Sequence, residues 1–441
     1  MQKPRLAIAG IVAAVLIAVP VAFAVGAHSR GPSQADLALI DGVIRLVESD
    51  YVHPVGSHKL TEDALKGMLS RLDPHSGYMD EEELKQSRAD ITGKFGGLGI
   101  QISEEHGVPK IISPIDGTPA VHAGLQPGDL IVAIDGTNTQ GLDLTEIVRV
   151  LRGQPGTSVK LTIARGSQTP FDVTLTRSII HVQTVKSMLE AGGIGYVRIT
   201  EFAGDTPADL KKALRDLKAQ AGGKLKGLVL DLRNDPGGLL SSAVEVAGNF
   251  LRGGKVVTIK GRHQSDNVTY HVSPGSTVLP DTPMIVLING ASASASEIVA
   301  GALQDRHRAK IMGTQSFGKG SVQTIIPLNG QGALRLTTAL YFTPDGRSIQ
   351  GQGIAPDIVV DVPKEQQVAG AVLPRESALH GAFRNPGPLG KAGQQGHAET
   401  VRAIARSAPI QTQLIGSDQD AQLKAAISYL TEAGKGTTGK G

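Results

Sequence analysis

The hydrophobic residues of this chain change their period from one region to the next, and each period predicts a different kind of element. In residues 31–90, apolar residues recur every three or four positions, which predicts an N-terminal helical region. Its second helix is expected to end before residues 73–74, Asp-Pro, because the residue before a proline avoids helical geometry. In residues 91–178, short apolar runs between glycine turns predict a compact β-rich module with a helix at about 144–151.

From residue 179 to 361, strand patterns alternate with helical patterns. An apolar strand at 228–232 is followed by a helical pattern at about 239–251, and another strand at 284–288 is followed by a helix. Repetition of strand, loop and helix indicates a layered α/β domain.

The two ends of the chain differ from the rest. Residues 362–441 are rich in Gly, Gln and Ala, so 365–398 is expected to be a flexible linker, and 419–433 has the pattern of one more helix. Within residues 1–30, Lys3 and Arg5 precede a long uncharged apolar run.

A cationic start before an apolar run is typical of a secretory signal, but this run is also long enough to span a bilayer. A cleaved signal peptide and an uncleaved membrane anchor both remain open. Either one places the rest of the chain outside the cytoplasm, in a bacterial periplasm, secreted or anchored in the inner membrane.

Composition excludes several classes of function. The chain has no cysteine, which rules out disulfides, thiolate metal sites and a cysteine nucleophile. Its net charge is +3 and only 3% of its residues are aromatic, so nothing favours nucleic-acid binding. No spacing matches a metal site, and we expect neither a metal nor a cofactor.

One serine lies between a strand end and a helix start. Ser294 follows the turn at 289–290, Asn-Gly, and its immediate neighbours are alanines. Ser294 and Glu297 fit the Ser-x-x-Glu capping box of an ordinary helix, which is the plainer interpretation when the serine is considered alone.

A lysine further along the chain favours a chemical interpretation. Lys319 lies between Gly318 and Gly320, and glycines allow the backbone to approach closely. A lysine in such a desolvated setting loses its proton more easily, and the neutral amine can take the proton of a serine hydroxyl.

These two motifs resemble those of the C-terminal processing peptidases, or tail-specific proteases, which are Ser–Lys serine endopeptidases. Residues 292–297 read SASASE and residues 317–323 read FGKGSVQ, and both match the family pattern. The resemblance implies that Ser294 is the nucleophile, Lys319 the general base, and Gln323 the residue that orients the lysine. It also implies a layered α/β serine protease core of the crotonase and ClpP type.

A glycine pair before a helix is the candidate oxyanion hole. Residues 231–238 read DLRNDPGG, which by itself suits a tight turn as well as an oxyanion hole. The family signature is Asp-Leu-Arg-Asn-x-Pro-Gly-Gly, so the resemblance implies an N–H from Gly237 or Gly238, with Gly238 preferred, and one from Ala295.

The β-rich module resembles a PDZ domain. Residues 97–100, GLGI, are similar to its carboxylate-binding loop, and residues 127–136, PGDLIVAIDG, strengthen the match. A glycine-rich turn can point backbone N–H groups at a terminal carboxylate while the peptide adds to the sheet edge. The expected peptide site consists of Leu98, Gly99, Ile100, Ile147 and Leu151. Core packing remains the alternative for the four of them that are not glycine.

The sequence therefore predicts a multi-domain α/β serine endopeptidase with an inserted PDZ domain, which captures protein substrates by their C-termini. An adaptor or activator protein is a further expected partner. His75 is a candidate base, but we interpret it as part of a structural loop because a Ser–Lys pair needs no histidine. The alternatives are a proteolytically weak, chaperone-like PDZ binding protein that needs a partner, and a non-peptidase acyl-transfer enzyme.

Overall fold

The computed structural model describes residues 31–105, 107–115, 117–368, 375–387 and 410–436. The chain divides into two units, Met1–Asp63 and Ala64–Gly441. The first contains helix α1 (Gln34–Asp50), which begins with a capping box between Ser33 and Asp36 and has no buried side chain. Helix α2 spans Ser57–Leu69. No helix of the described residues is long and apolar enough to cross a membrane, and the predicted targeting segment lies outside those residues.

The β-rich module folds around one apolar core. Ile111, Leu161 and Ile163 are fully buried in it, at alternate positions of their strands. Its sheet has the order β3-β4-β5-β7-β8, and β6 pairs with β5. The elements are β3 (Ile100–Glu105), β4 (Val108–Pro114), α4 (Pro119–His122), β5 (Leu130–Ile134), β6 (Thr137–Asn138), α5 (Leu144–Leu151), β7 (Ser158–Ala164) and β8 (Phe171–Thr176).

Two short strands join this module to the rest of the chain. Strand β2 (Lys94–Gly97) pairs antiparallel with β9 (Ser178–His181). Because the chain enters and leaves through this pair, the module is an insertion into the larger α/β domain.

A six-stranded sheet forms the centre of that domain. Its order is β10-β11-β12-β15-β16-β19, and every pair is parallel except β10 with β11. The strands are β10 (Val185–Glu190), β11 (Ile194–Ile199), β12 (Gly227–Asp231), β15 (Met284–Ile288), β16 (Lys310–Gly313) and β19 (Ile358–Val359). All five residues of β12 and of β15 are buried, as expected of strands covered on both faces.

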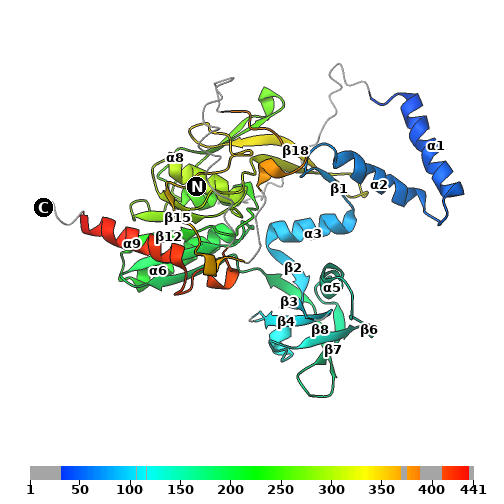
Figure 1. Ribbon diagram of the computed structural model, residues 1–441, viewed down its shortest axis with the longest axis horizontal. Coiled ribbons are helices and arrows are strands. Elements are labelled where there is room, and N and C mark those ends of the chain that lie inside the picture. The colour runs from blue at the N-terminus through cyan, green and yellow to red at the C-terminus, as the bar shows by residue number, and fades with distance from the viewer. Residues whose placement is uncertain (1–30, 106, 116, 369–374, 388–409, 437–441) are drawn as a thin grey trace, which may run out of the picture. The chain divides into compact units, whose positions relative to one another are not determined.

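Successive residues of β12 point to two different cores. Leu228 and Leu230 belong to the larger core, to which α6 (Thr206–Gln220), α7 (Leu240–Gly248) and α8 (Ala295–Asp305) contribute. Val229 packs on the other face with Leu423 and Leu430 of α9 (Ala421–Gly436). Figure 1 shows α9, in red, alongside this sheet. The C-terminal helix therefore completes the core of the α/β domain.

A buried ionic network fixes α9 to the end of β12. The Arg233 side chain is fully buried, with Nε 2.9 Å from Asp231 Oδ1 and Nη1 2.9 Å from Asp420 Oδ1. Tyr196 Oη donates to Asp231 Oδ2 at 2.8 Å, and Gln422 Oε1 accepts from Arg233.

The segment expected to be a flexible linker, 365–398, contains a buried residue in its described part. Glu376, in a 3-10 turn at Glu376–Ala378, is fully buried. A glycine- and glutamine-rich composition does not reveal such anchoring, because it depends on contacts with residues far away in the sequence.

A second sheet includes β17 (Ser321–Pro327), which begins two residues after Lys319. Its first strand, β1 (Gly77–Met79), comes from the region expected to be helical and pairs with β18. The remaining members are β13 (Lys255–Gly261), β14 (Val268–His271) and β18 (Ala333–Phe342). Helix α3 spans Glu81–Thr92, and further 3-10 turns lie at Gln264–Asp266, Lys364–Gln366 and Thr412–Leu414.

Candidate active site

Ser294 is held in a strained backbone conformation between β15 and α8. Its φ is 54° and its ψ −110°, which non-glycine residues rarely adopt and which is typical of functional positions. The neighbouring Ser292 and Ser296 are fully buried, and their hydroxyls donate to the carbonyl oxygens of Leu232 at 2.7 Å and Asp235 at 3.0 Å. Ser294 is thus the serine of this motif that solvent reaches.

The glycine pair packs directly against this serine. A Cβ on Gly237 would lie 2.8 Å from Ser294 Cβ and 2.9 Å from Ala295 N, so no side chain fits there. The Gly237 N–H donates to Asp235 Oδ1 at 2.8 Å. The N–H groups of Gly238 and Ala295 have no acceptor within the described part of the chain. Two free donors beside a nucleophile are what an oxyanion hole requires.

Lys319 lies in a loop whose backbone conformation and close packing require glycine on both sides of the lysine. Gly318 has a φ of 100°, and a Cβ on Gly320 would lie 2.3 Å from Gln350 N. Burial lowers the pKa of the Lys319 amine, against the raising effect of Glu376 and with a lowering contribution from Arg335. The lysine is therefore easier to deprotonate than a surface lysine.

Glu297 connects the serine loop with the lysine loop. Its fully buried carboxylate accepts four hydrogen bonds, and burial raises its pKa to about 7. The donors are Ser294 N at 2.8 Å, Ser316 Oγ at 2.5 Å, Gly318 N at 2.7 Å and Lys319 N at 2.9 Å. The capping-box pattern revealed Glu297 only as a helix cap, because its other donors lie about twenty residues further along the chain.

Gln323 is near these loops but contacts other side chains. Its Nε2 lies 3.1 Å from both Ser321 Oγ and Thr337 Oγ1. Across the described ranges, no hydrogen bond joins Gln323 to Lys319 or the Ser294 hydroxyl to the lysine amine. The structure therefore brings the serine and lysine loops together through Glu297, without direct contact between their reactive side chains.

His75, which is partly buried, pairs with the fully buried Glu376 near Lys319. His75 Nε2 lies 2.9 Å from Glu376 Oε2, and Gln350 Nε2 donates to Oε1 of the same carboxylate at 3.0 Å. Although burial acts to raise it, the pKa of Glu376 is lowered by these hydrogen bonds. The Glu376 N–H donates to the carbonyl of Phe317, next to the lysine loop. Sequence reasoning missed Glu376 because no motif or period marks it.

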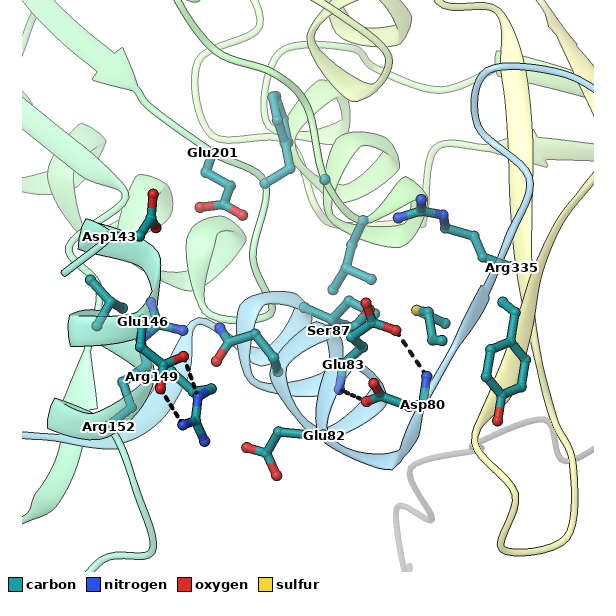
Figure 2. A pocket seen from close by; sticks show the side chains of 18 residues that line it. Asp80, Glu82, Glu83, Ser87, Asp143, Glu146, Arg149, Arg152, Glu201 and Arg335 are labelled. Carbon is teal, nitrogen blue, oxygen red and sulfur yellow. Dashed lines mark hydrogen bonds and ion pairs between the residues drawn. The ribbon is translucent and has the colours of Figure 1, made fainter. Parts of the chain in front are cut away.

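A cavity of about 940 Å³ borders Gly238. Its walls come from α3, from α5 of the β-rich module, from Glu201–Phe202 and from Gly238–Leu239. Figure 2 shows Glu201 and Asp143 among the side chains that line the cavity, and Arg149 bonded to Glu146. The cavity has room for a stretch of polypeptide beside Gly238.

The residues of the predicted peptide site lie in two different settings, the core of the β-rich module and the loop before β3. Leu98, Ile147 and Leu151 are buried in the module's core, and Ile100 packs partly buried against it. Gly99 has a φ of 77°, and the Leu98 and Gly99 N–H groups have no acceptor within the described residues. The three core side chains therefore match the packing alternative, whereas the backbone of the loop keeps free donors.

Three family models match successive parts of the chain. Residues 193–360 match peptidase family S41, residues 110–165 a PDZ domain, and residues 23–83 the activating protease CtpB N-terminal domain.

Similar proteins cover most of the chain. A carboxy-terminal-processing protease of Bartonella bacilliformis is 50% identical over 79% of this chain and 80% of its own length. A probable CtpA-like serine protease of Staphylococcus aureus is 38% identical over 76% of this chain and 67% of its own. The solved structure of a photosystem II D1 C-terminal processing protease is 29% identical and covers 74% of this chain and 92% of that chain, with a TM-score of 0.44.

Proposed function

The chain belongs to the C-terminal-processing proteases of peptidase family S41, serine peptidases with a PDZ domain, and we propose that it cleaves proteins with a Ser294–Lys319 dyad after binding their C-terminal tails. The observation that carries the proposal is the shared carboxylate of Glu297, which holds the backbones of Ser294 and Lys319 side by side. Ser294 is also the motif serine whose hydroxyl is not used in the core.

The proposed reaction begins with a neutral Lys319. The lysine stem turns toward Ser294, and the amine takes the hydroxyl proton as Oγ attacks the scissile carbonyl carbon. The tetrahedral oxyanion accepts hydrogen bonds from the Gly238 and Ala295 N–H groups, each worth about 3–4 kcal/mol. Lys319 then gives its proton to the leaving amine, the peptide bond breaks, and water hydrolyses the acyl-enzyme by the reverse use of the same groups.

Gln323 has a supporting role in this proposal. Its Nε2 is fixed by Ser321 and Thr337, which leaves Oε1 to accept a hydrogen bond from the Lys319 ammonium. The interaction would orient the amine once the lysine carries the proton.

Tail recognition is assigned to the PDZ domain. The free N–H groups of Leu98 and Gly99 suit a terminal carboxylate, and Ile100 lies at the start of the strand that a bound peptide would extend. The cavity beside Gly238 would take the segment to be cleaved. We place the reaction outside the cytoplasm, because residues 1–30 have the charge and apolar pattern of a signal or anchor.

The proposal is tested with the full-length protein and an unfolded substrate such as β-casein, with products followed by mass spectrometry. Wild type is expected to cleave, and Ser294→Ala and Lys319→Ala are expected to lose at least about a hundredfold in rate. Ser167→Ala and Lys218→Ala, at exposed positions, are the matched controls. Cleavage by Lys319→Ala at the wild-type rate would exclude the dyad, and amidation of the substrate's C-terminal carboxylate tests tail recognition separately. If wild type does not cleave until another protein is added, the alternative of a PDZ binding protein that needs a partner is favoured.

A further inference from the structure

Asp235 occupies the variable position of the DLRNDPGG motif and is fully buried beside the glycine pair. One carboxyl oxygen, Oδ1, accepts the Gly237 N–H at 2.8 Å. The other, Oδ2, is buried without a hydrogen-bond partner within the described residues. A buried carboxylate normally has partners for both oxygens, so the missing partner needs an explanation.

The main chain of the same residue holds the nucleophile loop. Its carbonyl oxygen accepts from Ala293 N at 3.0 Å and from Ser296 Oγ at 3.0 Å. Asp235 is therefore joined to the residues on both sides of Ser294, and through its side chain to the residue before Gly238. Any charge on it would be next to the atoms that hold the oxyanion.

The charged groups that face Asp235 do not neutralise a carboxylate. Burial raises the pKa of Asp235 well above its usual range, although the Gly237 N–H and the Ser296 hydroxyl act to lower it. Of the charged groups, Glu201 raises the pKa further and Arg198 lowers it. Within the described part of the chain, no cation lies at ion-pair distance from its carboxyl group.

We infer that Asp235 is a positioning residue of the oxyanion hole, and that it works in its uncharged form. Oδ1 occupies the Gly237 N–H, which leaves the next N–H, that of Gly238, directed at the substrate oxygen. Ionisation would put a negative charge beside the developing oxyanion, in a site where water does not screen it, and would slow acyl transfer. The inference rests on the proposed function, because it assumes that the oxyanion forms at Gly238.

The test compares wild type with Asp235→Asn, which keeps the shape and the acceptor oxygen but has no ionisable group. The rate constant for labelling of Ser294 by a fluorophosphonate is measured in the full-length protein from pH 5 to pH 10. This probe forms a tetrahedral adduct and needs no tail recognition. The ratio of the Asp235→Asn rate constant to that of wild type is expected to rise by about tenfold or more from the acid to the alkaline end, a fraction of the effect of one oxyanion donor.

Further variants separate this role from a structural one. Asp235→Ser, which also cannot ionise, is expected to show the same rise if the Asn variant folds poorly, and thermal melting reports folding of each. Asp305→Asn is the matched control, since this acid, whose side chain is buried, lies about 16 Å from Ser294 along α8 and pairs with Arg347. Its ratio to wild type is expected to stay constant with pH.

A ratio that is constant with pH for both folded Asp235 variants would overturn the inference and leave the dyad intact. Absence of labelling in wild type would contradict the proposed function itself, so the two failures are distinguishable.

Discussion

Ser294 and Lys319 donate their backbone N–H groups to the same oxygen, Oε2 of Glu297, at 2.8 and 2.9 Å. The two residues are 25 positions apart in the sequence, and this carboxylate sets the spacing of their loops. The separation of the proposed nucleophile and base thus depends on hydrogen bonds from their backbones to one buried carboxylate.

Replacing Glu297 with Gln is expected to lower kcat/KM by about tenfold to a hundredfold, because displacement of a catalytic group by a fraction of an ångström has effects of this size. An amide has one acceptor oxygen, so its NH2 group would face an N–H or hydroxyl donor that the carboxylate now binds. Steady-state kinetics on an unfolded protein substrate measure the change. Glu245→Gln, on the exposed side of α7, is the control. Unchanged kinetics in a folded Glu297→Gln protein would show that the shared carboxylate does not position the dyad.

The same glutamate is expected to make stability depend on pH. Its folded pKa of about 7 lies above the usual 4.5, so the folded state holds a proton that the unfolded state releases between these values. The penalty for burying the charge is absent below the unfolded pKa and complete above the folded one. The free energy of unfolding of wild type relative to Glu297→Gln should therefore fall by about 3 kcal/mol from pH 4.5 to pH 8. Urea unfolding at both pH values measures it, and a difference that rises with pH would contradict the assignment.

The charges around Lys319 predict two opposite shifts of the pH–rate profile. The carboxylate of Glu376 raises the pKa of Lys319 and the guanidinium of Arg335 lowers it. Glu376→Gln should therefore move the ascending limb of kcat/KM to lower pH, and Arg335→Gln should move it to higher pH. Glu365→Gln, an exposed acid of the same C-terminal region, should leave the limb in place. Two shifts in the same direction would show that the limb does not report the lysine.

The buried ionic network of Arg233, Asp231 and Asp420 at the end of β12 is expected to stabilise the packing of the C-terminal helix α9. Asp420→Ala leaves Arg233 with an incomplete set of partners, and breaking a buried pair in this way costs about 3–5 kcal/mol of the free energy of unfolding. Urea unfolding measures the loss. The exposed pair of Arg252 and Asp281 is the comparison, and Asp281→Ala should change the same quantity by less than about 1 kcal/mol. Equal effects of the two variants would mean that α9 contributes no more than a surface pair.

The family of the chain was readable from the sequence because the residues of the candidate site lie in short contiguous motifs. Ser294 and Lys319 are each flanked by small residues, which the tight local backbone conformation requires. The turn that ends at Gly238 likewise contains a pair of glycines. Local constraints of this kind involve residues that are adjacent in the sequence. Motifs and their spacing therefore predicted the α/β domain, the inserted module and the family.

The tertiary structure alone decided which distant groups surround those motifs. It joined β1 to β18, placed Glu376 next to the lysine loop and fixed α9 to Arg233, across separations of 258, 59 and 187 residues. It also showed that Gly237 donates to Asp235, which leaves the Gly238 N–H free. No local pattern encodes the contacts between distant segments, because each depends on burial and hydrogen-bond partners that exist only once the sheets have packed.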